Sequence, residues 1–443
     1  MLGGGLAGAS TAYALARAGF DDVTIVERGP RLGGLAGSFE RDGRFYPLGY
    51  HHILHLDRTL LFFLDLIGAL PDVRWRKIRM LFRVADRLFD LGTARDFLAF
   101  PMSFADKLRF ARLMAYAYGK REWHDWEGRT GAQLIDTWAG PAVREAIFEP
   151  LCRLKFELPS SAVSAAWLGA RLYFREGSAP LGYIPGANWT TTLCDGVTRL
   201  VTDAGVRIRT STDVVALHTS GDRVSAVELA GGERLDGAIV VSALPTETYL
   251  HLVPSDTTPH LAAVKFTALL SVVCATRQTV QPDFYWMNVA ERGHTACGIF
   301  LLTSLNPTIG TPGETCVNFV THLHDRDRPL FRVPDDELLA RYHDDFRRIF
   351  GTPLESCWSM ITRVPMYSPV LGPTFQNPPI ASTTWRNVYF AGNYRTFPSV
   401  VSTGTALASG LTAAQTIAEA HGRHTDLPDA VQRFTVPPMV RVR

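Results

Sequence analysis

Three glycines near the start constrain the fold of this chain most. Gly3, Gly5 and Gly8 have the spacing Gly-x-Gly-x-x-Gly. In this pattern the first glycine permits a tight turn, the second lets backbone approach a pyrophosphate, and the third lets a helix pack closely on a strand. Residues 7–18 are mostly apolar and predict a helix that ends before Gly19. The sequence therefore predicts a Rossmann-type βαβ unit whose helix N-terminus faces phosphate groups.

An acidic residue follows at the expected distance. The β-branched run at residues 23–26 predicts a strand, and it ends at Glu27, nineteen residues after Gly8. A carboxylate at this spacing accepts hydrogen bonds from ribose hydroxyls. Because only two residues precede Gly3, we expect either a very short first strand or a natural start further upstream.

Later segments resemble one family. Residues 27–38, with the pair Gly33-Gly34, are similar to the segment after the Rossmann acid in the FAD-dependent amine oxidase group, which includes protoporphyrinogen oxidases and phytoene-type desaturases. UDP-galactopyranose mutases share its FAD fold. Residues 238–245 resemble the second FAD signature of this group. Residues 387–393 resemble the third, Tyr-Phe-Ala-Gly-Asp, with Asn393 in place of the aspartate.

This resemblance, which covers almost the whole chain, implies the fold class. It is α/β, with a Rossmann-type FAD-binding domain and a discontinuous α+β substrate domain that has a helical part and an antiparallel sheet. The boundaries we expect are 1–70, 182–246 and 376–420 for the FAD-binding domain, 71–181 for the helical cap, 247–375 for the sheet, and 421–443 for a loose tail.

The resemblance also implies non-covalent FAD, since no cysteine is placed for a covalent flavin. Together with the glycine fingerprint it predicts the cofactor-binding residues. They are Gly3, Gly5, Leu6, Ala7, Gly8, Glu27, Arg28, Gly33, Gly34, Leu35, Gly49, Tyr50, His51, Val214, Val215, Gly392, Asn393, Ser402, Thr403, Gly404 and Ala406.

Candidate catalytic residues come from two segments. Residues 46–55 resemble the Gly-Pro-His-Ile-Phe-His segment of the mutases, which places His52 and His55 beside the flavin; a polar loop with satisfied histidines is the alternative. Residues 150–171 resemble a family segment in which a lysine is followed by an arginine. Arg171 would there clamp a diphosphate, and an ordinary arginine on the helix surface is the alternative.

Two segments raise the question of a membrane surface. The basic aromatic run 74–79 predicts an exposed strand, with contact to anionic lipid or to a phosphorylated substrate as the alternative. Residues 103–120 predict an amphipathic helix, with Thr130 as the N-cap of the next one. Such a helix more often packs at the edge of a core than it anchors to a membrane.

Composition narrows the class of protein. The chain has 443 residues and a formal net charge of +2, which offers no argument for nucleic-acid binding. Its six cysteines form no CxxC pair and no metal-ligand spacing, so we expect reduced thiols, no metal site and a cytoplasmic location. We expect no secretory leader and no membrane span. Peripheral membrane contact is a second expectation, and the oligomeric state stays open.

These features predict an oxidoreductase that uses FAD to remove a hydride from an amine, a porphyrinogen-like carbon or an allylic or polyene C–H. The electrons would pass to O₂ or another acceptor. A single Rossmann fingerprint argues against a built-in nicotinamide site. A sugar-nucleotide mutase is the first alternative, favoured by His52, His55 and Arg171, while residues 397–399 favour the oxidase. A non-catalytic FAD-binding partner subunit is the second alternative.

Overall fold

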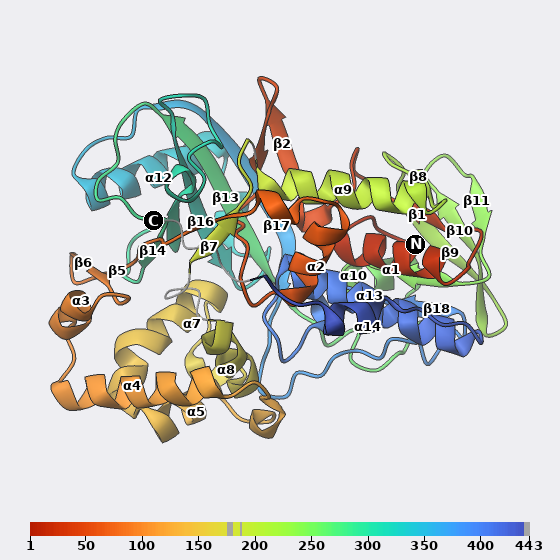
Figure 1. Cartoon of the computed structure of the whole chain (residues 1–443), viewed down its shortest axis with the longest axis horizontal. Coiled ribbons are helices and arrows are strands. Elements are labelled where there is room, and N and C mark those ends of the chain that lie inside the picture. The colour runs from red at the N-terminus through yellow and green to blue at the C-terminus, as the bar shows by residue number, and fades with distance from the viewer. Residues whose placement is uncertain (175–179, 187, 438–443) are drawn as a thin grey trace.

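The computed structural model describes residues 1–174, 180–186 and 188–437. Ala187, residues 175–179 of the expected cap and residues 438–443 of the expected tail lie outside the described residues. A half that contains a parallel sheet lies on the right of Figure 1. A second sheet lies at the upper left, above a group of helices at the lower left.

The parallel sheet confirms the Rossmann-type prediction. Its strands are β1 (Thr24–Val26), β8 (Arg207–Arg209), β12 (Val240–Ser242) and β18 (Val388–Phe390). β1 pairs with β8 and β12 pairs with β18, both in parallel. Leu2 joins the two pairs, because it forms parallel bridges to Val26 and to Ser242. Leu2 thus lies at the centre of the sheet, between β1 and β12.

Helices pack on one face of this sheet, and a small antiparallel sheet with one helix packs on the other. Ile25, Val241 and Tyr389 share one apolar cluster with the helices α1 (Leu6–Arg17), α2 (Arg58–Leu66), α9 (Trp189–Asp203) and α13 (Thr403–Ala420). Val26 and Val388 face the other way, toward an antiparallel sheet of β9 (Val214–Ser220), β10 (Arg223–Leu229) and β11 (Arg234–Asp236), and toward α10 (Thr246–Leu252). This alternation follows from the two-residue period of a strand.

The second sheet has the strand order β17-β13-β16-β15-β14-β5-β6. Five strands come from the predicted region: β13 (Phe266–Thr276), β14 (Trp286–Val289), β15 (Gly298–Leu301), β16 (Thr315–Leu323) and β17 (Ser356–Pro369). The other two, β5 (Met80–Val84) and β6 (Arg87–Asp90), come from the expected helical cap. The boundary there is wrong, because β5 pairs in parallel with β14 and so extends the sheet.

A helix packs on one face of the second sheet, and the opposite face contributes to a separate apolar cluster. Leu270, Val272 and Cys274 of β13 pack with α12 (Asp335–Phe350). Leu269 and Val273 point to the opposite side, where they share a cluster with residues of β14, β15 and the β3 strand. β3 (Arg44–Pro47) forms a hairpin with β2 (Ser38–Arg41) around Asp42 and Gly43.

The helical part forms a compact group around one apolar cluster. Ser103 and Thr130 cap the helices that follow them by accepting hydrogen bonds from the backbone N–H groups of Asp106 and Gln133, as predicted for Thr130. Its helices are α3 (Ala94–Ala99), α4 (Phe104–Gly119), α5 (Gly131–Trp138), α6 (Pro141–Val143), α7 (Glu149–Phe156) and α8 (Ala165–Phe174).

Smaller elements complete the chain. β4 (Arg74–Arg76) is the exposed strand predicted from the basic run, and it pairs with β7 (Leu181–Tyr183). α11 (Leu302–Leu305) follows β15. The expectation of a loose tail is wrong for α14 (Leu427–Arg433), because Leu427 and Val431 are buried in the cluster that holds α2 and α13.

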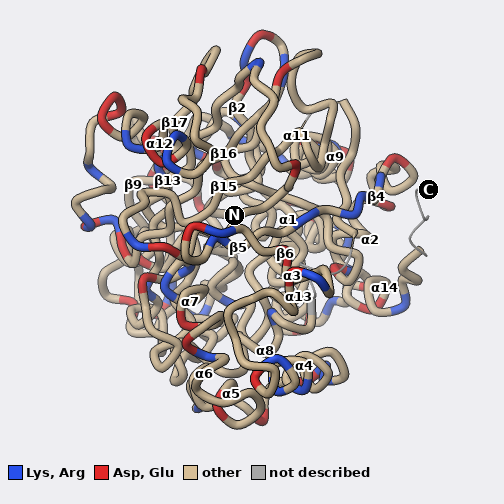
Figure 2. Tube along the Cα trace, turned by 90° about the vertical axis from the view of Figure 1, so that its left-hand side faces the viewer, with Lys and Arg blue, Asp and Glu red and all other residues tan. Residues whose placement is uncertain are grey.

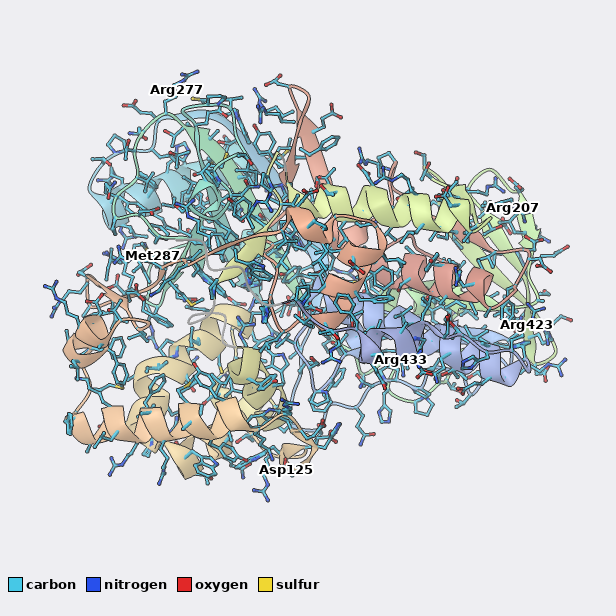
Figure 3. All side chains as sticks on the ribbon, in the orientation of Figure 1. Asp125, Arg207, Arg277, Met287, Arg423 and Arg433 are labelled. Carbon is cyan, nitrogen blue, oxygen red and sulfur yellow. The ribbon has the colours of Figure 1, made fainter. Side chains whose placement is uncertain are left out.

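Charged side chains point outward at the periphery, as Arg207, Arg277 and Arg423 show in Figure 3. Lys and Arg segments recur along α4 in Figure 2, between large apolar residues that are also exposed: Phe104 is 69% exposed and Leu108 58%. The suggested membrane contact of this helix stays a prediction. Within the described residues no helix has the length and hydropathy that crossing a bilayer requires.

Candidate active site

The fingerprint glycines and the Gly33-Gly34 pair form one cradle. The Gly33 N–H donates to the Gly4 carbonyl at 2.9 Å, and a Cβ on Gly5 would lie 3.9 Å from the Gly34 Cα. Gly3, Gly33 and Gly34 have φ angles of +92°, +129° and +56°. These values favour glycine strongly, so the backbone itself sets the shape of the cradle.

Helix α1 begins inside this cradle. No described side chain caps its N-terminus at Gly5. Leu6 and Ala7 follow as the first helical residues, and Gly8 packs so closely that a Cβ would lie 2.1 Å from the Gly3 carbonyl oxygen. The uncapped N–H groups of a first turn, with the positive end of the helix dipole, are a seat for an anionic pyrophosphate.

Glu27 holds the rim of the cradle. Its two carboxylate oxygens accept hydrogen bonds from the backbone N–H groups of Gly4 and Gly29, each at 2.7 Å. The Thr212 N–H donates to the Glu27 carbonyl at 3.0 Å, which brings the start of β9 close by. Val214 begins that strand, and the next residue, Val215, is 48% exposed. Three other predicted cofactor residues are exposed along the same loop: Arg28, Gly34 and Leu35.

The third motif joins the cradle from the C-terminal end. Ala7 is buried together with Ala391 and Ala413, so α1, the end of β18 and α13 meet closely. Gly392 has φ +153°, and the Asn393 side chain donates to the Tyr367 carbonyl at 3.0 Å. The sequence thus correctly predicts that segments far apart in the chain converge here.

A carboxylate that the sequence did not predict, that of Asp57, lies against the start of α13. Ser402 caps this helix, and its hydroxyl also donates to Asp57 at 3.0 Å. A Cβ on Gly404 would lie within 1.7 Å of an Asp57 oxygen. Thr403 and Ala406 lie in the first turn. Asp57 is buried, which raises its pKa, while hydrogen bonds from Leu60, Ser402 and Gly404 oppose that rise. Its place before α2 predicts an N-cap, but not its contact with α13.

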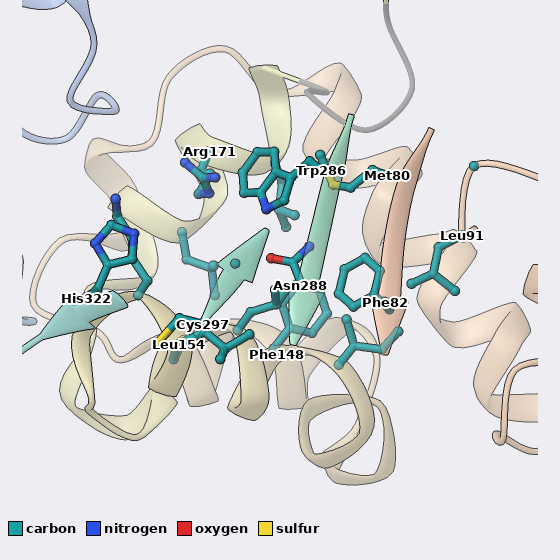
Figure 4. A pocket seen from close by; sticks show the side chains of 18 of the residues that line it. Met80, Phe82, Leu91, Phe148, Leu154, Arg171, Trp286, Asn288, Cys297 and His322 are labelled. Carbon is teal, nitrogen blue, oxygen red and sulfur yellow. The ribbon is translucent and has the colours of Figure 1, made fainter. Parts of the chain in front are cut away.

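A cavity of about 270 Å³ lies between the second sheet and the helical part. It is lined by β5, β14, β15 and β16 on one side and by α4, α7 and α8 on the other. Figure 4 shows Phe82, Phe148 and Trp286 among its walls. Most of the lining is apolar: Met80, Phe82, Leu91, Phe110, Met114, Ile147, Phe148, Leu151, Leu154, Trp167, Leu168, Leu172, Trp286, Phe300 and Val320.

Tyr50 connects the cofactor segment to this cavity. It is the one predicted cofactor residue among the described lining residues. Its ring stacks on Phe300 at a centroid distance of 3.9 Å and lies 5.6 Å from Trp286. Gly49 precedes it, and a Cβ there would lie 3.8 Å from Leu269 of β13. The loop 49–50 therefore lies between the parallel-sheet half and the cavity.

Polar side chains gather at one end of the cavity. The Arg171 guanidinium lies 5.9 Å from the Trp286 ring, and the Lys155 ammonium lies 5.2 Å from the Tyr367 ring. The His322 ring lies 5.5 Å from that same Tyr367. Figure 4 shows Arg171 and His322 toward one end and Leu91 toward the other. Arg171 was predicted, and Lys155 is the lysine of the same family segment.

His322 was missed by the sequence reasoning. It is buried, and among the described residues its Nδ1 has no hydrogen-bond partner. Burial lowers its pKa well below the usual range, and the nearby charges of Lys155 and Arg171 lower it further. The signal that could have found it is the two-residue alternation of β16, which puts His322 on the same face as Val320, another cavity residue.

The three predicted histidines separate. His52 lies near the cavity wall, with its Nδ1 3.2 Å from the Tyr285 hydroxyl and its ring 6.3 Å from that of Trp286. His51 lines a second, much smaller cavity, and burial lowers its pKa to about 4. His55 lies outside both cavities, because its Nε2 is 3.1 Å from the Pro437 carbonyl oxygen and its ring contacts Trp75.

Two cysteines line the main cavity without being reactive. Burial raises the pKa of the Cys152 and Cys297 thiols to about 12, so both stay protonated near neutral pH. Among the described residues there is no group of three or more His, Cys, Asp or Glu side chains that could hold a metal ion.

Comparisons with known proteins agree on one fold. The family model of the flavin containing amine oxidoreductase matches residues 6–418. No curated protein matches significantly in sequence.

Solved structures extend this comparison. An Exiguobacterium protein, provisionally assigned as a protoporphyrinogen oxidase, is 18% identical with a TM-score of 0.75 over 94% of this chain and 97% of its own. Reduced UDP-galactopyranose mutase is 13% identical with a TM-score of 0.71 over 95% of both chains. Putrescine oxidase with bound putrescine is 13% identical with a TM-score of 0.67 over 94% and 97%.

Proposed function

Because the chain belongs to the flavin-containing amine oxidoreductase family, for which FAD is the cofactor, we propose that it removes a hydride from an apolar organic molecule held in the main cavity. FAD supplies the hydride acceptor when bound, while the protein positions the substrate. The carrying observation is the cavity itself: an apolar chamber whose wall includes Tyr50, a residue of the predicted cofactor segment.

The cradle fits this cofactor. The uncapped N-terminus of α1 would hold the pyrophosphate, and Glu27 would accept from the ribose. The Gly33-Gly34 loop and the start of α13 would border the remaining length of the molecule. Within the described residues Cys194 is buried beside Gly33, and burial raises its thiol pKa to about 12. An inert thiol at the cradle supports non-covalent binding.

The apolar side chains that line the cavity would exclude water from a bound substrate. Phe82, Phe148 and Phe300 bury large apolar surfaces around the cavity, and a bound apolar molecule would complete that seal. Of the three predicted substrate classes, allylic or polyene carbons and porphyrinogen-like carbons suit this lining. A cationic amine suits it less, because the described lining contains no Asp or Glu that could pair with an ammonium group.

Anaerobic reduction of the purified flavoprotein tests this function. Candidate polyenes, porphyrinogens and amines are added without oxygen, and the flavin absorption bands are followed. Bleaching by an apolar substrate, followed by reoxidation with O₂ or a quinone, is the expected result. A flavin that none of these donors reduces, although dithionite does, would favour a non-catalytic partner subunit.

A sugar-nucleotide mutase remains the second candidate. Lys155 and Arg171 at one end of the cavity are the observation that favours it, because an arginine fork suits a diphosphate. Incubation of dithionite-reduced protein with UDP-galactopyranose separates the two candidates, since a mutase interconverts sugar ring forms only with reduced flavin and without net oxidation.

A further inference from the structure

We propose that the outer face of α3 and α4 binds the surface of an anionic lipid bilayer. This face, the α3–α4 face, consists of three large apolar side chains and three arginines that are all exposed: Leu98, Phe104, Leu108, Arg95, Arg109 and Arg112. Both helices lie at the outer edge of the helical part in Figure 1. The face is separate from the site of the proposed oxidation, because none of these residues is among the described residues that line the main cavity.

The most exposed large apolar side chains of the described chain meet on this face. Leu98 and Leu108 are each 58% exposed and Phe104 is 69% exposed, whereas the other exposed large apolar residues reach at most 48%. Phe104 and Leu108 lie one turn apart on α4. The Lys107 ammonium donates to the Leu98 carbonyl at 2.7 Å and so holds the end of α3 beside α4. Single exposed apolar residues are ordinary on a protein surface, but a group of them marks an interaction site.

The exposed charges on α3 and α4 have one sign. Every charged residue that is exposed on these two helices is an arginine. Their two carboxylates, Asp96 and Asp106, are partly buried near the helix starts. Asp96 accepts a hydrogen bond from the Asp90 N–H at 3.0 Å, while Asp106 accepts from the Ser103 hydroxyl at 2.6 Å and pairs with Arg109 at 2.7 Å. The α3–α4 face therefore presents guanidinium groups to solvent without an exposed carboxylate among them.

Acidic side chains on the neighbouring elements have basic partners elsewhere. Asp136 of α5 pairs with Arg144 at 2.9 Å, and Glu145 lies 3.6 Å from the same guanidinium. Asp125, in the segment after α4, pairs with Lys120 at 3.0 Å. These carboxylates are engaged away from the three arginines, so they do not cancel the positive charge of the α3–α4 face.

An anionic bilayer surface fits this combination of groups. Arginine stems can lie along an apolar layer while their guanidinium groups reach lipid phosphates, and leucine and phenylalanine side chains enter the boundary of the acyl chains. The exposed residues between them on α4 include Ala105, Ala111 and Ala115, which have no hydrogen-bonding side chain. A specific protein interface usually uses such side chains, so their scarcity on this face favours lipid over a protein partner.

The same helices also form part of the cavity wall. Phe110, Met114 and Tyr118 of α4 line the main cavity. The Phe110 ring lies 5.5 Å from that of Phe97 on α3 and 6.2 Å from that of Phe148, another lining residue. A bilayer bound at the α3–α4 face would therefore lie about 10 Å, one helix diameter, from the cavity. This position suits the apolar substrate of the proposed function, but the binding itself does not depend on that function.

Sedimentation of the flavin-loaded protein with vesicles tests the proposed binding. One set of vesicles is phosphatidylcholine alone, the other is an equimolar mixture of phosphatidylcholine and phosphatidylserine, and the protein left in the supernatant gives the partition coefficient. At low salt the mixed vesicles should bind the protein about tenfold or more tightly than the neutral vesicles, and high salt should weaken this binding.

Variants assign the binding to the α3–α4 face. Phe104→Ala and Leu108→Ala should each weaken partitioning into the mixed vesicles about tenfold, as expected for one large apolar side chain that loses its burial. Arg95→Gln should weaken it about fivefold at low salt, the contribution of one basic residue near an anionic surface.

Two matched controls lie elsewhere on the surface. Met360 is an exposed apolar residue on β17, at the opposite edge of the second sheet from β6, the strand that precedes α3. Arg207 is exposed on the opposite side of the molecule from α4 in Figure 3. Met360→Ala and Arg207→Gln should leave partitioning unchanged. Flavin content and circular dichroism verify that each variant folds.

Mixed vesicles that sediment no protein, equal binding to neutral vesicles, or a loss of binding that the controls share would overturn membrane binding by this face. Self-association that Phe104→Ala abolishes, in a protein that binds no vesicle, would assign the face to a second copy of the chain instead. If no substrate reduces the flavin, vesicle binding that the variants weaken as expected would still uphold the α3–α4 face and contradict only the proposed oxidation.

Discussion

The cofactor cradle and the substrate cavity are built by opposite means. The cradle around Gly5 is built by main-chain atoms. It consists of neighbouring glycines with positive φ, backbone hydrogen bonds and two helix N-termini. The cavity around Arg171 is side chain, contributed by seven strands and helices from both halves of the sequence. A backbone cradle tolerates few residues and fits one ligand, whereas a side-chain cavity can change its ligand by substitution alone.

The largest expected effect breaks the cradle alone. Gly5→Val should abolish FAD binding and keep the fold, because Gly5 has an ordinary φ of −63° and a Cβ there meets no protein atom closer than 3.9 Å. The branched side chain would instead enter the space of the pyrophosphate. The ratio of flavin to protein absorbance after purification measures the loss, and circular dichroism measures the fold.

Gly119→Val is the control for that experiment, since a Cβ on Gly119 meets nothing within 4 Å and the residue lies at the end of α4, far from the cradle in sequence. It should retain its flavin. If Gly5→Val also purifies yellow, the backbone does not approach the cofactor at this glycine.

A smaller loss is expected at the rim. Glu27→Ala should weaken FAD binding by about 1–3 kcal/mol, the scale of a hydrogen bond to a charged group. The carboxylate also holds the N–H groups of Gly4 and Gly29, so part of the effect comes from a looser cradle. FAD release followed by flavin fluorescence gives the dissociation constant. Asp22→Ala, on an exposed side chain nearby, should leave it unchanged.

His52 and His55 test the boundary between the cofactor cradle and the substrate cavity. His52→Ala should lower kcat at least tenfold, or about 1.4 kcal/mol, with flavin retained, because His52 contacts Tyr285 beside the cavity wall. His55→Ala should leave kcat unchanged, since His55 bonds the Pro437 carbonyl outside the cavity. Steady-state kinetics with a substrate that reduces the flavin measures both. A larger loss of kcat in His55→Ala than in His52→Ala would place the reaction on the His55 side of the loop that carries both histidines.

A further expected effect is a pH dependence of stability. His51 is neutral when folded, since its pKa is about 4, and it protonates more readily when unfolded, near pH 6.5. Unfolding therefore takes up protons below pH 6.5, and stability falls as the pH drops from 6.5 toward 4, by up to about 1.4 kcal/mol per pH unit. Thermal unfolding at pH 7, 6 and 5 measures the slope.

Substitution assigns that slope. His51→Gln should reduce the pH dependence and leave the share that His322 contributes through its own lowered pKa, whereas His124→Gln should not change it, because the His124 side chain is 67% exposed. Equal slopes in wild type and His51→Gln would show that His51 is hydrated in the folded protein.

The same contrast explains what could be predicted from sequence. The cradle motifs are local, because Gly3 and Gly392 are required by their own φ and Gly8 by its contact with Gly3, so Gly3 to Gly8 and residues 387–393 predicted the parallel sheet and its ends. The start of α5 was predicted because Thr130 itself caps the helix, a local signal that needs no distant partner.

The cavity could not be predicted in this way. β5 is five residues long, and its partner β14 lies about two hundred residues later, so only tertiary pairing decides its structure. His322 is one histidine in a buried strand, and its role depends on Lys155 and Arg171, which α7 and α8 bring to it. Asp57 likewise becomes notable only when α13 packs on it.

The hydrogen bond of the Asn393 amide restricts which residue can replace it. Its NH₂ donates to the Tyr367 main-chain carbonyl, an acceptor that exists whatever side chain stands at position 367. The aspartate found in the related motif would present an oxygen to that carbonyl and repel it. An Asn393→Asp change would therefore require strand β17 to move or another donor to replace the amide, because this hydrogen bond ties the third motif to the strand that carries Tyr367.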